Sequence, residues 1–450
     1  MRQAPLPAGE PAPLVSRAIP WPPSGARVAP RRGRPINRVA QWVGGHAERL
    51  YLLYVMLIMS GAGWSPPDPI ALEAGAAEGS LTNSIVALAY LIAVLLIMFR
   101  AGGVVRAALA HPWTLALLSV IAASALWSQA PDVSIRRAIA VVATCGIGWY
   151  LVARYPPREI IRLLAIVFVF TALLSLLHGV VNPASVILPL EGTWRGVYEN
   201  KNVFARAMAL SGLLCLILLL EPGRGRWLLW AGLALSCAMV GMSQSATGGI
   251  ILIALIILVR FSSSLRLRAT VLIPLAIVTL LLTAGGVYYL QFHAAELAAG
   301  IGKDTTFTGR TDLWSVAIMM IERHPWLGYG WGGFWRGFVG DSGQLWGAVG
   351  WKAPHAHNGF IDLTLDLGLI GLVVFVAGLV TAMAAAVARA RSARSVSAVA
   401  PLALLAFVIL YNLTESSVFR HNTLFLILYV VATSVACGGS ERARGRTAPQ

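Results

Sequence analysis

Two histidines and an asparagine stand directly before a long apolar segment. His355, His357 and Asn358 occur in "KAPHAHNGFIDLTLDLGLIG", in a chain of 450 residues with only 8 histidines. Asn358 is suited to cap the helix that this segment predicts, because its side chain can accept hydrogen bonds from the first backbone N–H groups. His357 would then lie at the positive end of the helix dipole, which disfavours imidazolium and leaves a ring nitrogen able to accept a proton. This placement is typical of a general base.

Other roles for the histidine pair stay open at this point. His357 could serve only as a hydrogen-bonding residue, and His355 could be the base in its place. The pair could also bind zinc, but the neighbouring sequence offers no evident third and fourth ligand. We therefore expect no metal ion at this position.

Cationic residues stand beside two further helix starts, where they are suited to an anion. Unpaired N–H groups and the positive dipole end of a helix favour phosphate, and basic side chains add to this. Arg310, in "TFTGRTDLW", would lie just before a helix capped by Thr311. The alternatives are an ordinary polar loop in which Asn202 caps the following helix, and a surface salt bridge for Arg310. The other helix start lies earlier in the chain, in "EGTWRGVYENKN". Its cations are Arg195 and Lys201, and Tyr198 and Asn202 are the polar residues beside them.

The segment after Arg310 predicts an amphipathic helix at the membrane surface. It is rich in tryptophan, and aromatic residues commonly anchor proteins at such surfaces. Trp331 could instead support a sugar ring. The expected apolar stripe consists of Leu313, Ala317, Ile318 and Ile321.

The elements that must position these residues are those of an integral membrane protein. The chain is 57% hydrophobic and 12% charged, with a mean hydropathy of +0.73, whereas soluble domains are about 25% charged. Its apolar runs of roughly 15 to 22 residues match the length that a hydrocarbon core requires of a helix. We therefore expect an all-α polytopic membrane protein with about twelve transmembrane helices and a large outside loop, 292–357, between helices 9 and 10. The spans should begin near Leu50, Ser84, Pro112, Arg136, Ile160, Val203, Trp227, Ser245, Thr270, Gly359, Ala400 and Thr423.

The net charge of +16 comes from short basic groups between apolar runs. This pattern indicates the positive-inside rule and not a nucleic-acid partner. With the N-terminus inside, all the polar segments named above lie on the outer face. Residues 1–45 are rich in Pro, Gly, Ala and Arg and predict a disordered basic cytoplasmic tail. Residues 46–438 then form the membrane domain, and 439–450 a second cytoplasmic tail.

These segments, in this order, resemble the O-antigen ligase family, which includes O-antigen ligases and the related O-antigen and exopolysaccharide polymerases. The resemblance rests on "NKN", "GRTDLW", "HPWLGYGWGGF" and "HAHNGFIDLTLDLGLIG", and it covers mainly residues 194–371. It implies a metal-independent, inverting glycosyltransferase without a cofactor, acting at the periplasmic face of the bacterial inner membrane. By the same resemblance, Arg195 and Arg310 hold the diphosphate of the lipid-linked donor, and His357 deprotonates the acceptor hydroxyl.

The partners that the resemblance implies are a glycan donor linked to undecaprenyl diphosphate, an acceptor and membrane lipids. The acceptor would be lipid A core for a ligase or a lipid-linked repeat for a polymerase, and "ENKN" and "GYGWGGFW" favour an exopolysaccharide polymerase. A transporter or flippase of lipid-linked oligosaccharide is the alternative. Transporters commonly bind near the midplane through broken helices and internal repeats, whereas here the polar residues gather at one face.

Overall fold

The structure is a computed structural model that describes most of the chain. The described residues are 35–63, 80–187, 192–260, 262, 308–392, 395–416, 419–420 and 422–438. Four expected features lie outside them: the tail over 1–34, the span from Thr270, the loop residues 292–307 and the tail over 439–450. Residues up to Leu50 form one unit, whose described part is the beginning of helix α1 (Pro35–Met59). This helix begins inside the segment expected to be a tail.

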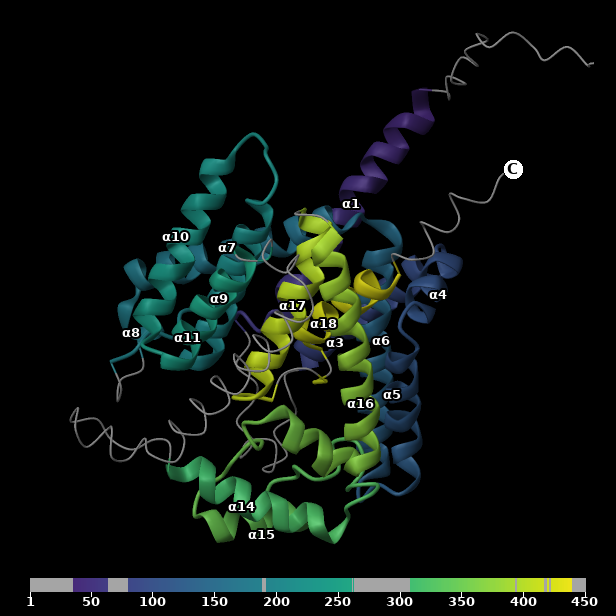
Figure 1. The fold of residues 1–450 in the computed structure, drawn as a ribbon, viewed down its shortest axis with the longest axis vertical. Coiled ribbons are helices and arrows are strands. Elements are labelled where there is room, and N and C mark those ends of the chain that lie inside the picture. The colour runs from purple at the N-terminus through teal and green to yellow at the C-terminus, as the bar shows by residue number, and fades with distance from the viewer. Residues whose placement is uncertain are drawn as a thin grey trace, which may run out of the picture. The chain divides into compact units, whose positions relative to one another are not determined.

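The second unit, from Tyr51 onward, is built from helices in its described part (Figure 1). A single antiparallel β-bridge, between Ile187 and Trp194, occurs among the described residues. After the end of α1, the helices are α3 (Ser80–Met98), α4 (Ala101–Leu109), α5 (Pro112–Ala123), η1 (Ser124–Leu126), α6 (Pro131–Arg154), α7 (Pro157–Val181), α8 (Pro183–Val186), α9 (Lys201–Leu218), α10 (Arg226–Ser243), α11 (Ala246–Arg260), α14 (Thr308–Arg323), α15 (Asp341–Val349), α16 (Gly359–Ser392), α17 (Val396–Asn412) and α18 (Leu424–Cys437).

Each predicted apolar segment among the described residues falls on a helix. The helices α6, α7, α9, α10 and α16 are long and apolar enough to cross a membrane, and α3 with α4 forms a bent pair, at 95°, that passes the same test. Shorter apolar helices include α11, α17 and α18. The described chain is thus that of an all-α multi-pass membrane protein, and the number of about twelve spans stays a prediction.

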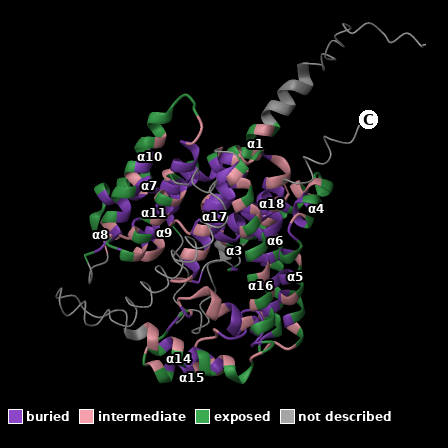
Figure 2. Ribbon diagram, viewed as in Figure 1, coloured by how far each residue is buried: buried purple, intermediate pink, exposed green. Residues whose placement is uncertain are grey.

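The core lies where the central helices pack together. Helix α9 packs against α7, α10 and α11, while α18 packs against α6, α16 and α17. Figure 2 shows α17 and α18 mostly buried and the outer faces of α5, α10 and α16 exposed. The exposed faces carry large apolar side chains such as Trp113, Trp227 and Val373. Such faces suit lipid contact, because lipid does not penalise exposed apolar surface.

Helices α14 and α15 lie together beside the start of α16 (Figure 1) and enclose a small core of their own. The predicted stripe of α14 is correct for Leu313 and Ala317, which are fully buried, but wrong for Ile318, which is 49% exposed. Val316 and Met320 complete the buried stripe. The reason is the helical period, because these two residues stand three and seven positions after Leu313 and so share its face, whereas Ile318 stands five positions on.

Helix α16 is broken at Gly368, whose backbone has φ 63° and ψ −166°. The "HPWLGYG" segment fills the break. The Leu369 N–H donates to the Pro325 carbonyl at 2.8 Å, and the Tyr329 N–H donates to the Leu365 carbonyl at the same distance. A Cβ on Gly368 would collide with the backbone of Trp326. The glycine therefore permits a close backbone contact that fixes the segment after α14 to the first turns of α16.

Candidate active site

The two histidines lie in the loop 353–358, called the histidine loop below. Hydrogen bonds to the backbone of this loop fix its position. The indole N–H of Trp314, on α14, donates to the Ala356 carbonyl over 2.7 Å. The carboxylate of Asp362, in the first turn of α16, accepts from the Ala356 N–H at 3.0 Å and from the Trp335 indole at 2.8 Å. Asp362 also accepts a hydrogen bond from the Ser416 hydroxyl. It therefore joins the histidine loop to the loop that follows α17.

The local backbone of the histidine loop follows from two side chains. Asn358 Oδ1 accepts from the N–H groups of Phe360 and Ile361 at 3.0 and 3.4 Å, so the predicted cap of α16 is confirmed. His357 has a left-handed backbone, with φ 51°, which residues other than glycine rarely adopt. Its N–H donates to Nδ1 of His355 over 3.1 Å. The turn thus places both imidazole rings on the same side of the loop.

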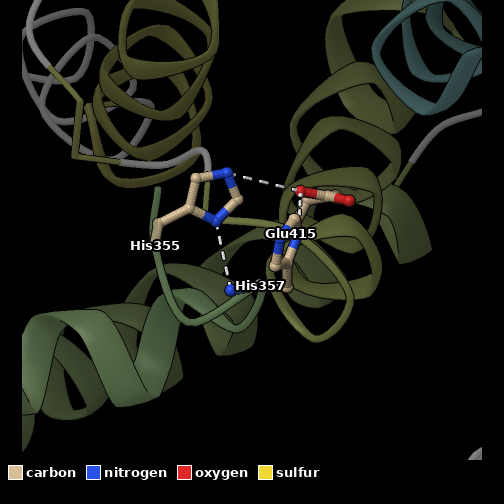
Figure 3. Close-up of side chains that lie close together, drawn as sticks. All are labelled: His355, His357 and Glu415. Carbon is tan, nitrogen blue, oxygen red and sulfur yellow. Dashed lines mark hydrogen bonds and ion pairs between the residues drawn. The ribbon is translucent and has the colours of Figure 1, made fainter. Parts of the chain in front are cut away.

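Both rings converge on the carboxylate of Glu415, in the loop after α17 (Figure 3). His357 Nδ1 lies 3.1 Å from Glu415 Oε2, and His355 Nε2 lies 3.8 Å from the same oxygen. The other oxygen, Oε1, receives Nη2 of Arg310 at 3.2 Å, and Nη1 of this arginine donates to the Thr414 carbonyl at 3.0 Å. The side chains of this group are only 12–19% exposed, so solvent screens their charges weakly.

The hydrogen bonds determine where the protons lie. His355 Nδ1 accepts from the His357 backbone, so the proton of a neutral His355 is on Nε2, facing Glu415. Burial and the positive charge of Arg420 lower the pKa of His355 well below its ordinary value and keep the ring neutral. Burial alone would raise the pKa of Glu415, but the hydrogen bond from His357 and the charges of His357 and Arg310 hold it below the ordinary range.

Glu415 is therefore an ionised acceptor for the proton on His357 Nδ1. This arrangement leaves the lone pair of His357 on Nε2, the nitrogen that does not contact Glu415. A carboxylate paired with an imidazole orients the ring and stabilises the imidazolium that forms when Nε2 takes up a proton. The group can thus act as a general base.

The same three residues are also a possible metal-ligand set. Ligand atoms of His355, His357 and Glu415 lie within 4.8 Å of one another, and two imidazoles with a carboxylate are common zinc ligands. Glu415 supplies a third ligand that the neighbouring sequence did not offer. However, the hydrogen of each ring faces the carboxylate, and Arg310 engages its second oxygen. A dication would have to displace these hydrogens beside guanidinium charges, so the geometry favours proton transfer.

The cationic segment before α9 is fixed by hydrogen bonds of its own. Nε and Nη2 of Arg195 donate to the Ser185 carbonyl at 3.3 and 3.1 Å, and Nη1 donates to the Glu199 carbonyl at 3.3 Å. Asn200, and not the predicted Asn202, caps α9, because its Oδ1 accepts from the second and third helical N–H groups at 3.0 Å. The cap stands one position before the helix, since Lys201 is already its first residue.

The other candidates of this segment have structural contacts. The Tyr198 hydroxyl is buried and donates to Thr171 at 2.9 Å. Asn202 Oδ1 accepts from the Ser245 hydroxyl at 3.1 Å and so joins α9 to the turn before α11. Lys201 opens α9. No hydrogen bond or ion pair among the described residues joins Arg195, Tyr198 or Asn202 to the histidine pair.

Arg310 differs in position from the prediction. Helix α14 begins at Thr308, so Arg310 lies within its first turn and Thr311 is inside the helix rather than at its cap. The helix start is therefore earlier than the sequence pattern indicated, although Arg310 does face the histidine loop through Glu415. A salt bridge for Arg310 was the alternative interpretation, and the structure contains one, in a largely buried setting.

The tryptophans of this region have contacts that membrane anchoring does not explain. Trp314 and Trp335 direct their indole N–H groups to the histidine loop and to Asp362. Trp331 is 6% exposed, and its backbone N–H donates to the Ser124 hydroxyl, so its ring is part of the core. Trp326, at 66% exposed, retains the position expected of an anchor.

Four further charged residues act at this site: Glu199, Arg206, Glu415 and Arg420. Burial raises the pKa of Glu199 above its ordinary value, although the positive charges of Arg420 and Arg206 oppose the shift. Arg206 also acts on Glu415, and both arginines act on His355. The segment before α9 and the histidine loop therefore share one electrostatic environment. The sequence offers a signal for Arg206, because it is a lone charge in an apolar helix. It offers none for the pairing of Glu415 with His357, because 58 residues separate them and only the fold brings them together.

Comparison with known proteins shows similarity to one family of membrane enzymes. The family model described as O-antigen ligase matches residues 229–376, which include the histidine loop. The exopolysaccharide production protein ExoQ of Rhizobium meliloti is 29% identical over 288 residues, which is 60% of this chain and 64% of that protein. The ComP-specific O-oligosaccharyltransferase of Acinetobacter baylyi is 26% identical over 135 residues, 30% of this chain and 24% of that protein.

The chain thus spans less than two thirds of the length of either relative. The match to the family model still contains the loop that organises the site, with His355, His357 and Asn358 at the start of α16. These matches show that the chain is similar to the O-antigen ligase family over residues 229–376, and its all-α membrane architecture agrees with that similarity.

Proposed function

We propose that this protein transfers glycan from undecaprenyl diphosphate to an acceptor hydroxyl at the periplasmic face of the bacterial inner membrane. The observation that carries the proposal is the pairing of His357 Nδ1 with Glu415 at 3.1 Å, which leaves Nε2 able to accept a proton. Support comes from the family match, since residues 229–376 include His357.

In the proposed reaction, His357 Nε2 takes the proton of the acceptor hydroxyl. The acceptor oxygen attacks the anomeric carbon of the donor sugar, and the bond between that carbon and the phosphate oxygen breaks. Undecaprenyl diphosphate leaves with the electron pair, and attack from the opposite face inverts the anomeric configuration. Glu415 stabilises the imidazolium that forms, as a carboxylate does in other carboxylate–histidine pairs.

The leaving diphosphate needs positive charge, and the proposal supplies it from the protein. Arg310 lies 3.2 Å from Glu415, the carboxylate that both histidines approach. With Arg195 and Lys201 it forms the proposed diphosphate clamp. Guanidinium groups can bind phosphate oxygens in a bidentate manner and carry their charge at every physiological pH, so the mechanism requires no metal ion.

The proposed arrangement in the membrane keeps the site on one side. The membrane domain would comprise residues 46–438 and cross about twelve times, with the tails 1–45 and 439–450 cytoplasmic. The loop 292–357, between the ninth and tenth spans, would be periplasmic. Its described part, from Thr308, packs on the start of α16, where the histidine loop also ends.

We further propose that the acceptor is a lipid-linked repeat, so that the protein is a polymerase. The name of the first relative, an exopolysaccharide production protein, favours this choice over lipid A core. The second relative is named as an O-oligosaccharyltransferase specific for ComP, so a protein acceptor is the alternative.

The test is product analysis with purified protein in lipid. Undecaprenyl-diphosphate-linked repeat units from the host are supplied with and without lipid A core, and with EDTA present. A ladder of repeats without the core supports the polymerase, and transfer only to the core would make the protein a ligase. If EDTA stops transfer and zinc restores it, the metal-independent mechanism is wrong. If no sugar changes carrier, the proposed activity is wrong.

A further inference from the structure

A groove beside the last turns of α16 has no part in the proposed reaction, because the histidine loop adjoins the other end of this helix. One wall of the groove is the stretch of α16 from Leu379 to Arg391, and Ile409 of α17 completes it. Its volume is about 550 Å³, within the range of about 300–1,000 Å³ that is common for ligand sites. The groove is therefore large enough to hold a ligand.

The helical period explains the shape of this groove. Leu379, Met383 and Val387 follow one another at intervals of four residues and so lie on one face of α16. Ala384 and Ala388 stand beside them with the same spacing. Each alanine has only a methyl group, so the two leave a hollow between their larger neighbours. Both alanines are exposed, on the outer face of α16 that is seen in Figure 2, so the hollow is accessible.

The groove has about the length of one membrane leaflet. Helix α16 carries no charged residue from Leu369 to Ala388, and this stretch of roughly 30 Å matches the thickness of a hydrocarbon core. Arg391 follows directly and so lies at the level of the lipid headgroups. From Arg391 to Leu379 the helix rises by about 18 Å, slightly more than half of the core. The groove thus extends from the headgroups to about the centre of the bilayer.

A guanidinium group marks the headgroup end of the groove. Arg391 lines it and is partly exposed, and no acidic residue occurs among the described lining residues. The nearby Arg389 has another role, because its Nε donates to the Ser397 carbonyl at 3.2 Å and its Nη1 to the Val435 carbonyl at 2.8 Å. Arg389 therefore joins α16 to α17 and α18, while Arg391, about 200° further around the helix, lies at the groove.

We propose that this groove binds a phospholipid with an anionic headgroup, whose phosphate lies at Arg391 and whose acyl chain follows the apolar wall up to Leu379. Guanidinium groups bind phosphate oxygens well, and basic side chains beside a membrane attract anionic lipids. A zwitterionic lipid offers the same chain, but its ammonium group is repelled by the two arginines. The site lies in the leaflet opposite the histidine loop, so it does not depend on the proposed transfer reaction.

The experiment measures thermal unfolding of the full chain in nanodiscs of phosphatidylcholine that contain an increasing fraction of phosphatidylglycerol. Phosphatidylglycerol should raise the unfolding temperature of the wild type in a saturable manner, because a ligand that binds only the folded state stabilises it. Arg391→Gln should require roughly 5-fold more phosphatidylglycerol for half of this rise, which corresponds to about 1 kcal/mol for one arginine at an anionic membrane surface. Ala384→Trp fills the groove, leaves every charge in place and should abolish the saturable rise.

Each variant has a matched control. Arg162→Gln removes an exposed arginine from α7, outside the groove. Val373→Trp places the same ring on α16 at a residue that is 64% exposed and does not line the groove. Both controls should respond to phosphatidylglycerol as the wild type does.

Four results would overturn the proposal. The first is an unchanged response in Arg391→Gln or in Ala384→Trp. The second is an equal loss of response in Arg162→Gln and Arg391→Gln, which would indicate a general effect of surface charge. The third is stabilisation by undecaprenyl phosphate with none by phosphatidylglycerol, because the groove would then select a polyprenyl chain. The fourth is a lower unfolding temperature of Ala384→Trp than of Val373→Trp in pure phosphatidylcholine, which would show that protein and not lipid fills the groove.

Discussion

Replacing Glu415 by glutamine tests the pair that the mechanism depends on. The amide keeps the size of the side chain and removes its charge. The wild-type carboxylate accepts from His357 with one oxygen and from Arg310 with the other. An amide offers only one acceptor oxygen, so one of these two donors must lose its partner. The substitution therefore weakens both the orientation of His357 and the stabilisation of its imidazolium.

The size of the effect follows from the distance. Two unit charges 3.1 Å apart attract by about 5 kcal/mol at an effective dielectric constant of roughly 20. If the proton is about half transferred in the transition state, about 2.5 kcal/mol of stabilisation is lost. This corresponds to a decrease of roughly 50- to 100-fold in the rate of transfer.

The assay is a single-turnover measurement of glycan transfer, so that product release does not hide the chemical step. Glu322→Gln is the matched control, because Glu322 is an exposed glutamate on α14. We expect Glu322→Gln to transfer at the wild-type rate. If Glu415→Gln retained more than about one third of the wild-type rate, the assignment of Glu415 as the partner of the base would be refuted.

Two further predictions concern the residues around the pair. Asp362→Ala removes the acceptor of Ala356 N–H and Trp335, so the rate of transfer at saturating substrate should fall by about 10-fold or more with little change in KM; an equal rise in KM would contradict a positioning role. The pKa of His355 is lower in the folded than in the unfolded state, so the unfolded chain takes up this proton first as the pH falls below about 6.5, and stability decreases. The unfolding temperature should therefore be lower at pH 5.5 than at pH 7.5, and His355→Asn should reduce this difference; an unchanged difference would refute the buried neutral state.

The local features of the site were predictable from the sequence because they depend on neighbouring residues. The cap by Asn358 and the position of His357 just before α16 follow from side-chain chemistry and helix geometry within a few residues. Similarly, the apolar segments predicted helices, because backbone groups in lipid must be satisfied within each segment. The cap of α9 was misplaced because Asn200 and Asn202 are equally suited to the role by type.

The partners of these residues could not be predicted in the same way. Glu415 meets His357 only because the loop after α17 packs against the start of α16, and Asp362 binds both loops. These contacts depend on tertiary packing, which helical periodicity does not encode. The contacts of Arg195 with the backbone carbonyls of Ser185 and Glu199 show the same limit, since position before a helix does not indicate which backbone groups hold the side chain.

The most direct test of the account is the rate of glycan transfer by His357→Ala, measured in a single turnover with undecaprenyl-diphosphate-linked repeat units. A general base contributes roughly 10²- to 10⁴-fold, and Nε2 of His357 is the proposed proton acceptor. We predict a loss of this size in a protein that still unfolds cooperatively. Transfer at a near-normal rate would contradict the account, because the proton would then leave by a route that does not involve His357.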